Sequence, residues 1–362
     1  MKKGIVTGSR TSGGKLVIFT RIPVFCAAVK LGDEVIYDAL NADEPYDRRT
    51  HVFYSDSFPS DGTVLFMYKA TSRSARIRTC AVGLADAEKT DRESFIAETD
   101  NGISPNGETR IELAPGVEYI ALNCADRHGL PVKIFVLTVE AGSARLYTGT
   151  PDDGFMPKNV RAKVPDMIAA AEKNGVSPIA AVNADFFDMF GDSHPAGLCV
   201  KRGRVVANGF SDRPFVGQKR NGEYVIGTVP ELSGGLSELE TAVGGLELIV
   251  DDGKLADIGE LEPFSSIRHP RTAAGITRGG GLILAVVDGR IEEYSNGASL
   301  VDLADLMISF GAQRAVNLDG GGSCVMYIKT GGGMELQNVP ADLVRPRAKL
   351  IRKEFDCLIL TA

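Results

Sequence analysis

Apolar and polar residues alternate in short runs through the first third of the chain. From Pro23 to about Glu140, strand-like segments are separated by turns rich in Pro, Gly, Asp and Asn. These segments are residues 52–54, 64–68, 75–82, 109–113 and 119–123. Short strands at this spacing are typical of two packed antiparallel sheets, so the pattern predicts a β-sandwich. The small, polar and glycine-rich residues 4–14 predict a loose arm or a first turn.

Helical periodicity begins only after residue 140. Residues 159–173 carry apolar side chains at i, i+4, i+7, i+8 and i+11, and Asn174-Gly175 follows as a stop signal, which predicts an amphipathic helix. A second helix is predicted to start at Ser299, which forms a capping box with Asp302, and to end at Gly311. The apolar residues of the two helices are Val160, Val164, Met167, Ile168 and Ala171, then Leu300, Leu303, Ala304, Met307 and Ile308.

The change of pattern divides the chain into two predicted domains. Its 362 residues exceed the usual size of a single hydrophobic core, so we expect two cores. Helices join strands only in the later part. We therefore predict an all-β, sandwich-like accessory domain over residues 1–138 and an α+β domain over residues 139–362, in which helices flank a mixed β-sheet.

Two apolar runs of the second domain lead into polar residues. The buried run 178–182 is followed by Asn183 and Asp185, and functional groups often lie at such strand exits. An Asp-Gly pair suits a tight hairpin turn. We therefore predict a hairpin made of residues 282–287, the turn Asp288-Gly289 and residues 291–294.

A third apolar run ends in a glycine triplet. Residues 316–323 read Val-Asn-Leu-Asp-Gly-Gly-Gly-Ser, so a strand ends at Asp319 and three glycines precede Ser323. Because glycines let backbone N–H groups turn inward, the loop is suited to receive an anion such as phosphate beside one carboxylate. The alternative is a plain hairpin turn, and the motif alone does not choose. The triplets at 279–281 and 331–333 lack these flanks and are interpreted as turns.

The charge balance is mildly acidic. The chain has 40 basic and 47 acidic residues, a net charge of −7 spread along its length, which argues against nucleic acid and favours a small or neutral substrate. No apolar stretch approaches the ~20 residues that cross a bilayer, so no membrane span is expected. The N-terminus shows no evident signal peptide. The location is secreted or cell-surface if a leader has been removed and cytoplasmic otherwise, and the oligomeric state is left open.

Cysteine, histidine and glycine spacing excludes several kinds of site. The six cysteines form no C-x-x-C pair and are expected to be buried free thiols, and the four histidines have no H-x-x-x-H spacing for zinc. No phosphate-binding G-x-x-x-x-G-K-[ST] motif exists, and the glycine triplet leads into a strand-like run instead of a helix. Gly191-Asp192-Ser193 resembles an esterase motif, but Ser266 lies where that family needs an Asp before the last histidine, His269.

Aspartates gather where the apolar runs end. Asp185, Asp188 and Asp192 follow the first run, Asp288 lies in the predicted hairpin, and Asp319 precedes the glycine triplet. Most loop aspartates are solvated turn residues, so the grouping at strand ends is what indicates chemistry. Carboxylate oxygens also suit Ca²⁺ or Mg²⁺, although no calcium-loop spacing is present, and no cofactor is firmly implied.

An arginine and two aromatic residues lie near these aspartates in the sequence. Arg271 begins an apolar run, where it suits a bidentate grip on phosphate, with a surface salt bridge as the alternative. Phe186 and Phe187 favour a core role over a sugar platform. The chain has no tryptophan, which weakens a simple carbohydrate-binding interpretation.

Taken in order, these segments resemble the phosphodiester glycosidase family. Pro270-Arg271-Thr272-Ala273, Val287-Asp288-Gly289-Arg290 and the stretch from Asn317 to Ser323 match motifs of that family. Further matching stretches are residues 181–188, 197–205, 243–245 and 252–254. The resemblance covers roughly residues 139–362 and leaves the first third unassigned.

The resemblance implies a hydrolase that breaks the glycosidic C–O bond of a sugar 1-phosphodiester, on N-acetylglucosamine phosphodiesters or exopolysaccharide-related glycans. Asp319 is the first candidate to activate water or trap the sugar cation, and Asp185 is the second. Asp288 and Arg290 would orient them. A phosphate leaving group needs electrostatic clamping more than protonation. The implied substrate-binding residues are Asn183, Phe187, His194, Arg271, Thr272, Arg290, Asn317, Gly320, Gly321, Gly322 and Ser323.

Several alternatives stay open at this point. Two carboxyl groups ~5 Å apart would favour a retaining route, and ~6.5–9.5 Å an inverting one. A metal-dependent phosphodiesterase would use the same aspartates and break the P–O bond instead. A non-catalytic exopolysaccharide-binding protein would bind glycan through the N-terminal domain and show no turnover.

Overall fold

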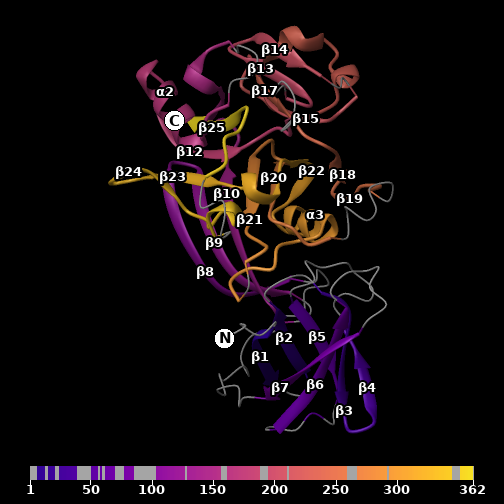
Figure 1. The fold of residues 1–362 in the computed structure, drawn as a ribbon. Helices are drawn as coiled ribbons and strands as arrows, with labels where there is room; N and C mark the ends of the chain where they lie inside the picture. Colours follow the sequence, from indigo (N-terminus) through magenta and orange to yellow (C-terminus); the bar gives the residue numbers. More distant parts are fainter. Residues whose placement is uncertain are drawn as a thin grey trace. The chain divides into compact units, whose positions relative to one another are not determined.

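The computed structural model shows a chain built mostly of β-strands, with few helices (Figure 1). No described helix combines the length and the apolar character needed to cross a membrane. The chain divides into two compact units, of which the first comprises residues 1–97, 127–129 and 266–268 and the second comprises residues 98–126, 130–265 and 269–362. The structure describes residues 6–12, 15–20, 24–38, 50–55, 58, 62–69, 77–84, 103–126, 129–155, 161–187, 195–209, 212–258, 267–291, 293–344 and 351–361.

The described residues of the first unit form strands in two sheets. Apolar side chains of both sheets, including Leu16, Phe53 and Phe66, share one core. The three-stranded sheet has the order β1 (Val6–Ser12), β2 (Lys15–Thr20), β5 (Thr50–Tyr54). The four-stranded sheet has the order β4 (Glu34–Tyr37), β3 (Phe25–Leu31), β6 (Gly62–Lys69), β7 (Arg78–Leu84).

One expectation for this unit was wrong. Residues 4–14 were predicted as a loose arm or a first turn, but Val6–Ser12 form a strand, β1, that pairs with β2 in an antiparallel hairpin from Ser12↔Lys15 to Val6↔Thr20. The small polar residues of β1 have a low propensity for strands. Pairing with the apolar strand β2 outweighs that propensity. The complete sandwich remains a prediction, since parts of the first unit lie outside the described residues.

The second unit contains three sheets, and every pairing between their described strands is antiparallel. The largest has the order β19 (Lys254–Leu255), β18 (Leu248–Asp251), β22 (Ala312–Leu318), β20 (Arg271–Thr277), β21 (Leu282–Val287), β10 (Pro131–Val139), β9 (Val117–Asp126), β8 (Ile103–Ala114). A five-stranded sheet has the order β11 (Arg145–Gly149), β25 (Cys357–Thr361), β12 (Pro178–Asn183), β23 (Met326–Thr330), β24 (Gly333–Leu336). Another has the order β14 (Arg204–Asn208), β13 (Leu198–Lys201), β17 (Leu239–Gly244), β15 (Phe215–Lys219), β16 (Tyr224–Gly227).

The main apolar core lies between these sheets. Leu284 of β21, Leu358 of β25 and Val216 of β15 belong to one cluster, so one face of the eight-stranded sheet packs against both five-stranded sheets. Its other face packs against α3 (Leu300–Ser309). The sheet that contains β12 packs its outer face against α2 (Val164–Lys173), and Figure 1 shows α2 beside β12 and α3 beside β22. Strands covered on both faces read as continuous apolar runs, which explains the sequences of β12 and β21.

The domain boundary in the structure differs from the predicted one at 138/139. Strands β8, β9 and β10 belong to the second unit, where β10 pairs with β21 in the register Leu137↔Leu284. Alternating residues identify a strand, but they do not reveal which sheet the strand joins. The predicted mixed sheet also has no parallel pair among the described strands, and even strands far apart in the chain, such as β10 and β21 or β12 and β25, pair antiparallel.

Both predicted helices are present. α3 begins after Ser299, whose hydroxyl accepts from the Asp302 N–H in the predicted capping box, and Gly311 follows it at φ +88°. α2 ends at Lys173 before Gly175 at φ +84°, as predicted, but it starts at Val164 because Pro165 suits the first turn. The short helices are η1 (Pro151–Asp153), η2 (Val229–Glu231), η3 (Gly235–Glu238), η5 (Gly321–Ser323) and α4 (Ala341–Val344).

The predicted hairpin around Asp288-Gly289 was wrong. β10 and β20 pair with the two edges of β21, so no edge remains for residues 291–294. Ile291 instead forms an isolated bridge with Ser295, and Arg290 has a φ of +60°. The buried free thiols were predicted correctly for Cys124, Cys199, Cys324 and Cys357, whereas Cys80 is partly exposed.

Candidate functional site

Polar residues of two sheets meet where β12 and β22 end. Asn183, the last residue of β12, is fully buried, and its Nδ2 donates to the main-chain oxygen of Asp319 at 2.6 Å. Its Oδ1 accepts from Thr272 Oγ1 at 2.8 Å and from the Val325 N–H at 3.1 Å. The Asp319 N–H donates to the Ala184 carbonyl at 2.8 Å. These bonds hold the chain after β12 beside the chain after β22.

The glycine triplet is a tight turn that uses most of its own donors. The Gly320 N–H donates to Asp319 Oδ1 at 2.8 Å, and the Gly321 N–H donates to the Pro270 carbonyl at 2.8 Å. Gly321 has a φ of +67°, which favours glycine at that position. Two of the three amides expected to clamp an anion are thus engaged within the protein. The turn instead fixes Asp319 and the buried Ser323.

Asp319 occupies a strongly perturbed electrostatic environment. Burial raises the pKa of its carboxyl from 3.8 to about 6. A hydrogen bond with Ser323 and the charges of Arg352 and Arg290 oppose the effect of burial on this pKa. A carboxyl that titrates near neutral pH is suited to general acid–base chemistry.

Asp185 lies on the first turn of chain after β12 and is 2% exposed. Its Oδ2 accepts from the Gly197 N–H at 2.8 Å, whereas its Oδ1 has no hydrogen-bond partner among the described residues. Burial raises its pKa well above the ordinary value, and the neighbouring charge of Asp356 raises it further. Gly244 packs against this carboxyl so closely that a Cβ there would lie 2.6 Å from Asp185 Oδ2.

Two carboxyl groups that the sequence analysis missed complete the cluster. Asp356 Oδ1 accepts from the Asp185 N–H at 3.0 Å, and burial raises the Asp356 pKa to about 6. Glu354 is 3% exposed, and burial together with the charge of Asp319 raises its pKa to about 8. Oxygen atoms of both side chains lack hydrogen-bond partners among the described residues. The only sequence signal is the alternation of charged and apolar residues just before β25.

Arg352 and Arg290 supply positive charge to this cluster. Arg352 Nε and Nη2 donate to Asp342 Oδ2 at 3.0 and 2.8 Å, and its Nη1 donates to Ser323 Oγ at 3.2 Å. The Arg290 guanidinium lies against Gly321, where a Cβ would be 2.9 Å from Nη1. Its Nε donates to His269 Nδ1 at 3.1 Å. The bond to Asp342 fixes the Arg352 fork, as anion recognition requires.

Arg271, the predicted phosphate clamp, faces the other side of the sheet. Successive side chains of a strand point to opposite faces, and Thr272 points to Asn183. The Arg271 Nε donates to the Ala298 carbonyl, just before α3, at 3.1 Å. The side chain is 1% exposed, and burial lowers its pKa to about 10 despite the opposing charge of Glu247.

Asn317 and Glu247 extend the same buried region. Asn317 Nδ2 donates to Glu247 Oε1 at 3.4 Å, so this predicted binding residue contacts a carboxyl that the sequence analysis missed. Burial raises the Glu247 pKa to about 7, opposed by the charges of Arg271 and Arg213.

Asp288, the third predicted catalytic carboxyl, has both oxygens engaged. Its Oδ1 accepts from Asn338 Nδ2 at 2.7 Å, and its Oδ2 accepts from the Val339 N–H at 2.8 Å and from Tyr294 Oη at 3.1 Å. Burial raises its pKa to about 6. These contacts anchor the segment before α4, which carries Asp342, so Asp288 supports the arginine that reaches Ser323.

The remaining predicted residues lie at the periphery or outside the described residues. The Phe187 ring lies under the guanidinium of Arg161, with 5.5 Å between its centroid and Cζ. His194, Asp188 and Asp192 lie outside the described residues. Among the residues that are described, no three His, Cys, Asp or Glu side chains are arranged to hold a metal ion.

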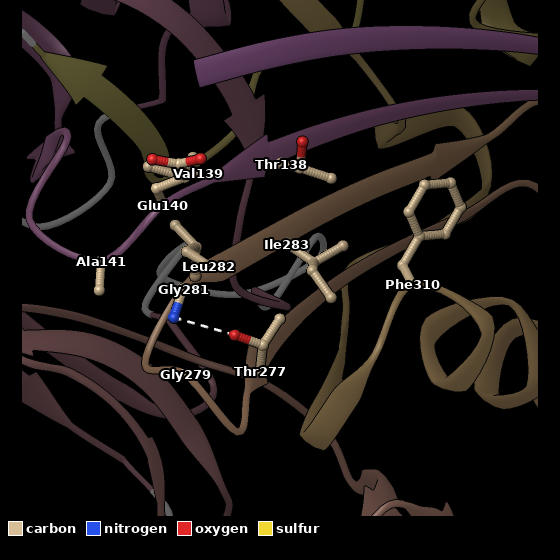
Figure 2. Close-up of a pocket in the computed structure, with 10 residues that line it drawn as sticks. All are labelled: Thr138, Val139, Glu140, Ala141, Thr277, Gly279, Gly281, Leu282, Ile283 and Phe310. Atoms are coloured by element: carbon tan, nitrogen blue, oxygen red, sulfur yellow. Dashed lines mark hydrogen bonds between the residues drawn. The ribbon is translucent and has the colours of Figure 1, made fainter. Parts of the chain in front are cut away.

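A hollow of about 370 Å³ lies away from this cluster (Figure 2). It is lined by residues of β10, β20, β21 and their loops, with Phe310 after α3. Thr277 and Leu282 lie at the opposite ends of β20 and β21 from Arg271 and Val287, which places the hollow about 20 Å of strand away from Asp319. The hydrogen bond drawn there joins the Gly281 N–H to Thr277 Oγ1 at 3.0 Å. Its lining offers few convergent polar groups, so the carboxyl cluster is the candidate site.

Sequence comparison connects this region to a known family. Residues 177–351 match the family described as phosphodiester glycosidase. N-acetylglucosamine-1-phosphodiester alpha-N-acetylglucosaminidase of Mus musculus is 27% identical over 165 residues, which cover 41% of this chain and 31% of that protein. The Homo sapiens protein of the same name is 25% identical over 163 residues, with the same coverage of 41% and 31%. The chain therefore spans about a third of the length of these relatives.

Structural comparison gives a consistent fold. The catalytic domain of the zebrafish N-acetylglucosamine-1-phosphodiester alpha-N-acetylglucosaminidase has a TM-score of 0.56 and 20% identity, covering 71% of this chain and 88% of that one. A hypothetical protein from Synechocystis has a TM-score of 0.52 and 14% identity, covering 99% of this chain and 80% of that one. At these identities the likeness concerns the fold alone.

Proposed function

The chain belongs to the phosphodiester glycosidase family, and from this premise we propose that it hydrolyses a sugar 1-phosphodiester. The reaction breaks the glycosidic C–O bond and releases a sugar and a phosphate monoester. One observation carries the proposal: the turn after β22 fixes Asp319 beside Ser323, which Arg352 contacts, and the charges of Arg352 and Arg290 act on the Asp319 carboxyl, whose pKa burial raises to about 6. That combination offers a base and an anion-binding region in one place.

The proposed roles follow from the position of each group. Asp319 activates water or stabilises the oxocarbenium-like sugar, and Asp185, with one carboxyl oxygen lacking a hydrogen-bond partner among the described residues, is the second carboxyl. Arg352 and Arg290 stabilise the departing phosphate, which needs charge more than a proton. Arg352 is suited to this because Asp342 fixes its guanidinium.

The proposed substrate class comes from the relatives. The Mus musculus relative is named for N-acetylglucosamine in phosphodiester linkage. We extend that class to this chain as N-acetylglucosamine 1-phosphodiesters and related phosphorylated glycans. The described cluster holds both buried carboxyls and arginines, so it suits a substrate with a sugar carbon at one end and a phosphate at the other.

Product analysis in ¹⁸O-labelled water tests this function. The purified chain is incubated with a panel of sugar 1-phosphodiesters, with and without a chelator, and the label is located by mass spectrometry. We expect ¹⁸O in the sugar and full activity in chelator, because water attacks carbon. Label in the phosphate would indicate P–O cleavage, and restoration of chelated activity by one cation would indicate a metal-dependent phosphodiesterase. Glycan binding without turnover on the whole panel would contradict an enzymatic role.

A further inference from the structure

We propose that His269 is a positioning residue for phosphate: its neutral imidazole holds the Arg290 guanidinium against Gly321 of the glycine triplet, where Arg290 receives the phosphate of the substrate. This role rests on the proposed function of the site. The sequence analysis used His269 only to exclude an esterase motif. The basis for the new role is a direct contact between the two side chains and the way in which the backbone fixes both of them.

One hydrogen bond joins the two side chains. Arg290 Nε donates to His269 Nδ1 at 3.1 Å. A guanidinium has only donors and stays charged, so Nδ1 must offer its lone pair. The imidazole is therefore neutral and carries its proton on Nε2. A protonated imidazole would have an N–H group on both nitrogens, could not accept this bond, and would repel the guanidinium.

The backbone of His269 is fixed on both sides. Its N–H donates to the Ala298 carbonyl at 3.1 Å, and the Ala298 N–H donates to the His269 carbonyl at 3.0 Å. Gly297 packs so closely that a Cβ there would lie 2.5 Å from the His269 carbonyl oxygen. The next residue, Pro270, accepts from the Gly321 N–H at 2.8 Å. His269 is therefore one residue away from the bond that anchors the glycine turn.

The backbone of Arg290 is held in an unusual conformation. Its φ is +60°, in the left-handed region that side chains other than glycine rarely adopt. Gly289, just before it, approaches the other segment so closely that a Cβ would lie 2.7 Å from Pro270 N and 3.0 Å from the His269 carbonyl carbon. Such a conformation persists only where the surroundings impose it, and it is frequent at ligand-binding positions. The contacts of Gly289 thus bring Arg290 beside His269.

The glycine turn leaves room for the guanidinium. A Cβ at Gly321 would lie 2.9 Å from Arg290 Nη1 and 3.6 Å from both Cζ and Nη2. Gly321 is therefore required for two reasons, its φ of +67° and the space that Arg290 occupies. Because Nε is bonded to His269, the edge of the guanidinium at the turn is the one formed by Nη1 and Nη2. Paired N–H groups of this kind suit the two oxygens of a phosphate.

The charges around Arg290 show why it needs a neutral partner. Burial raises the pKa of Asp319 to about 6, and the charge of Arg290 opposes that rise. Burial also raises the pKa of the Cys324 thiol and lowers that of Arg271 to about 10, and the charge of Arg290 acts on both. Of these three groups, only the Asp319 carboxylate attracts a cation. Without the bond to His269, Arg290 would be drawn toward Asp319, and each would then partly neutralise the other.

Phosphate binding to two variants of His269 tests this role. The probe is inorganic phosphate, titrated calorimetrically at about pH 7.5, where an ordinary imidazole is neutral. His269→Leu removes the acceptor and should weaken binding about tenfold, the loss expected when a charge-assisted contact is misplaced. His269→Asn places an amide oxygen near the position of Nδ1 and should stay within about threefold of the unmodified chain. Equal losses in the two variants, or no phosphate binding by the unmodified chain, would overturn the proposal.

A double-mutant cycle separates positioning from general packing. Arg290→Met should weaken phosphate binding about 10- to 100-fold, and His269→Leu added to it should change binding by less than about twofold more. Independent losses that add in the double variant would contradict the proposed role of His269. Arg278→Met is the matched control, because Arg278 is exposed and follows the other end of β20, and it should bind phosphate as the unmodified chain does.

The protonation of His269 can be measured without any substrate or ligand. In a chain labelled with ¹⁵N at its histidines, the signals that disappear in His269→Asn belong to His269. They should be those of a neutral ring protonated at Nε2, and an imidazolium at neutral pH would refute the proposal. If the unmodified chain binds phosphate but turns over no sugar 1-phosphodiester, the proposed function fails, and the comparison of His269→Leu with His269→Asn still decides the role of His269.

Discussion

Two buried clusters of charged side chains lie in the second unit, and they are built in opposite ways. In the first, Asp153 Oδ1 accepts from Lys201 Nζ and from Tyr147 Oη, both at 2.6 Å. Its Oδ2 accepts from Asn174 Nδ2 at 2.9 Å and from Arg202 Nη2 at 3.2 Å. Burial alone would raise the Asp153 pKa, but the hydrogen bonds from Lys201 and Tyr147 outweigh it and lower the pKa.

The second cluster is the candidate site, where carboxyls outnumber their partners. Asp185, Asp356 and Glu354 each keep an oxygen without a hydrogen-bond partner among the described residues, and the pKa of each is raised. Buried polar atoms in folded proteins are normally satisfied, and carboxyls that combine an unpaired oxygen with a raised pKa are frequent at functional sites. Both clusters are buried, so burial does not distinguish them. What distinguishes them is whether each carboxyl oxygen has a hydrogen-bond or ion-pair partner.

The same isosteric change in each cluster tests this contrast most strongly. Asp319→Asn should lower kcat by on the order of 10³-fold, because the amide can neither accept a proton nor stabilise the sugar cation. Its thermal midpoint should stay at or above that of the unmodified chain, because the carboxyl is costly to bury. Steady-state kinetics and differential scanning calorimetry measure the two effects. Near-native turnover in Asp319→Asn would remove Asp319 from the mechanism.

Asp153→Asn should show the reverse result. The change leaves the buried Lys201 ammonium without its carboxylate, and breaking a buried ion pair typically costs about 3–5 kcal/mol of unfolding free energy. The kcat should change less than about threefold under conditions where the variant is folded, because Asp153 contacts no group of the candidate site in the structure described. Urea denaturation gives the unfolding free energy. A stable but inactive Asp153→Asn would contradict the division between the clusters.

Much of the fold was visible in the sequence because the signals are local. Ser299 and Asp302 form the predicted cap, and the run before Asn183 is a buried strand with the polar residue at its exit. The pairing of distant strands was not visible, since Leu137 gives no sign that it will lie opposite Leu284. The prediction of a hairpin at Asp288 was wrong for the same reason, because β10 and β20 already pair with both edges of β21.

The site was predicted in part for a related reason. Asp319 and Asp185 follow apolar strands, and that placement can be read locally. Glu354 and Asp356 precede a strand without any glycine or turn motif, and only the sheet order brings β25 beside β12. Arg271 was assigned to phosphate from its residue type, but its position on the strand directs it to the face covered by α3.

The pH dependence of stability should have opposite signs in the two clusters. The Glu354 pKa rises from an ordinary 4.5 to about 8, so its contribution is fully present below about pH 4.5 and is lost as the pH rises through 8. The Asp153 pKa is lowered from 3.8, so its contribution is present above that value and is lost as the pH falls through the lowered pKa.

Denaturation of Glu354→Gln across a pH series measures this difference. The unfolding free energy of the unmodified chain should decrease as the pH rises from 4.5 to about 8, and Glu354→Gln should lack on the order of 5 kcal/mol of that decrease. The exposed Glu335→Gln variant should follow the unmodified chain. An identical decrease in all three proteins would show that Glu354 keeps an ordinary titration, and the contrast between the clusters would then rest on Asp185 and Asp356 alone.

The smallest expected effect concerns the close packing of Gly244 against the Asp185 carboxyl. Gly244 ends β17, and a Cβ there would lie 2.6 Å from Asp185 Oδ2 and 2.7 Å from the Gly197 Cα. Gly244→Ala must therefore displace the carboxyl or the strand, at about 1–3 kcal/mol of unfolding free energy. We expect kcat to fall about tenfold, because a small displacement of a reacting carboxyl is costly.

Gly331→Ala provides the matched control, since a Cβ at Gly331 meets nothing within 4 Å and the residue lies in the turn between β23 and β24. That variant should keep both stability and kcat. A Gly244→Ala variant with a lower unfolding free energy and an unchanged kcat would show that β17 shifts and that Asp185 stays in place. The close contact between Gly244 and Asp185 would then play no part in the reaction. Loss of kcat at nearly unchanged stability would show instead that the close glycine contact exists to keep the second carboxyl aimed into the site.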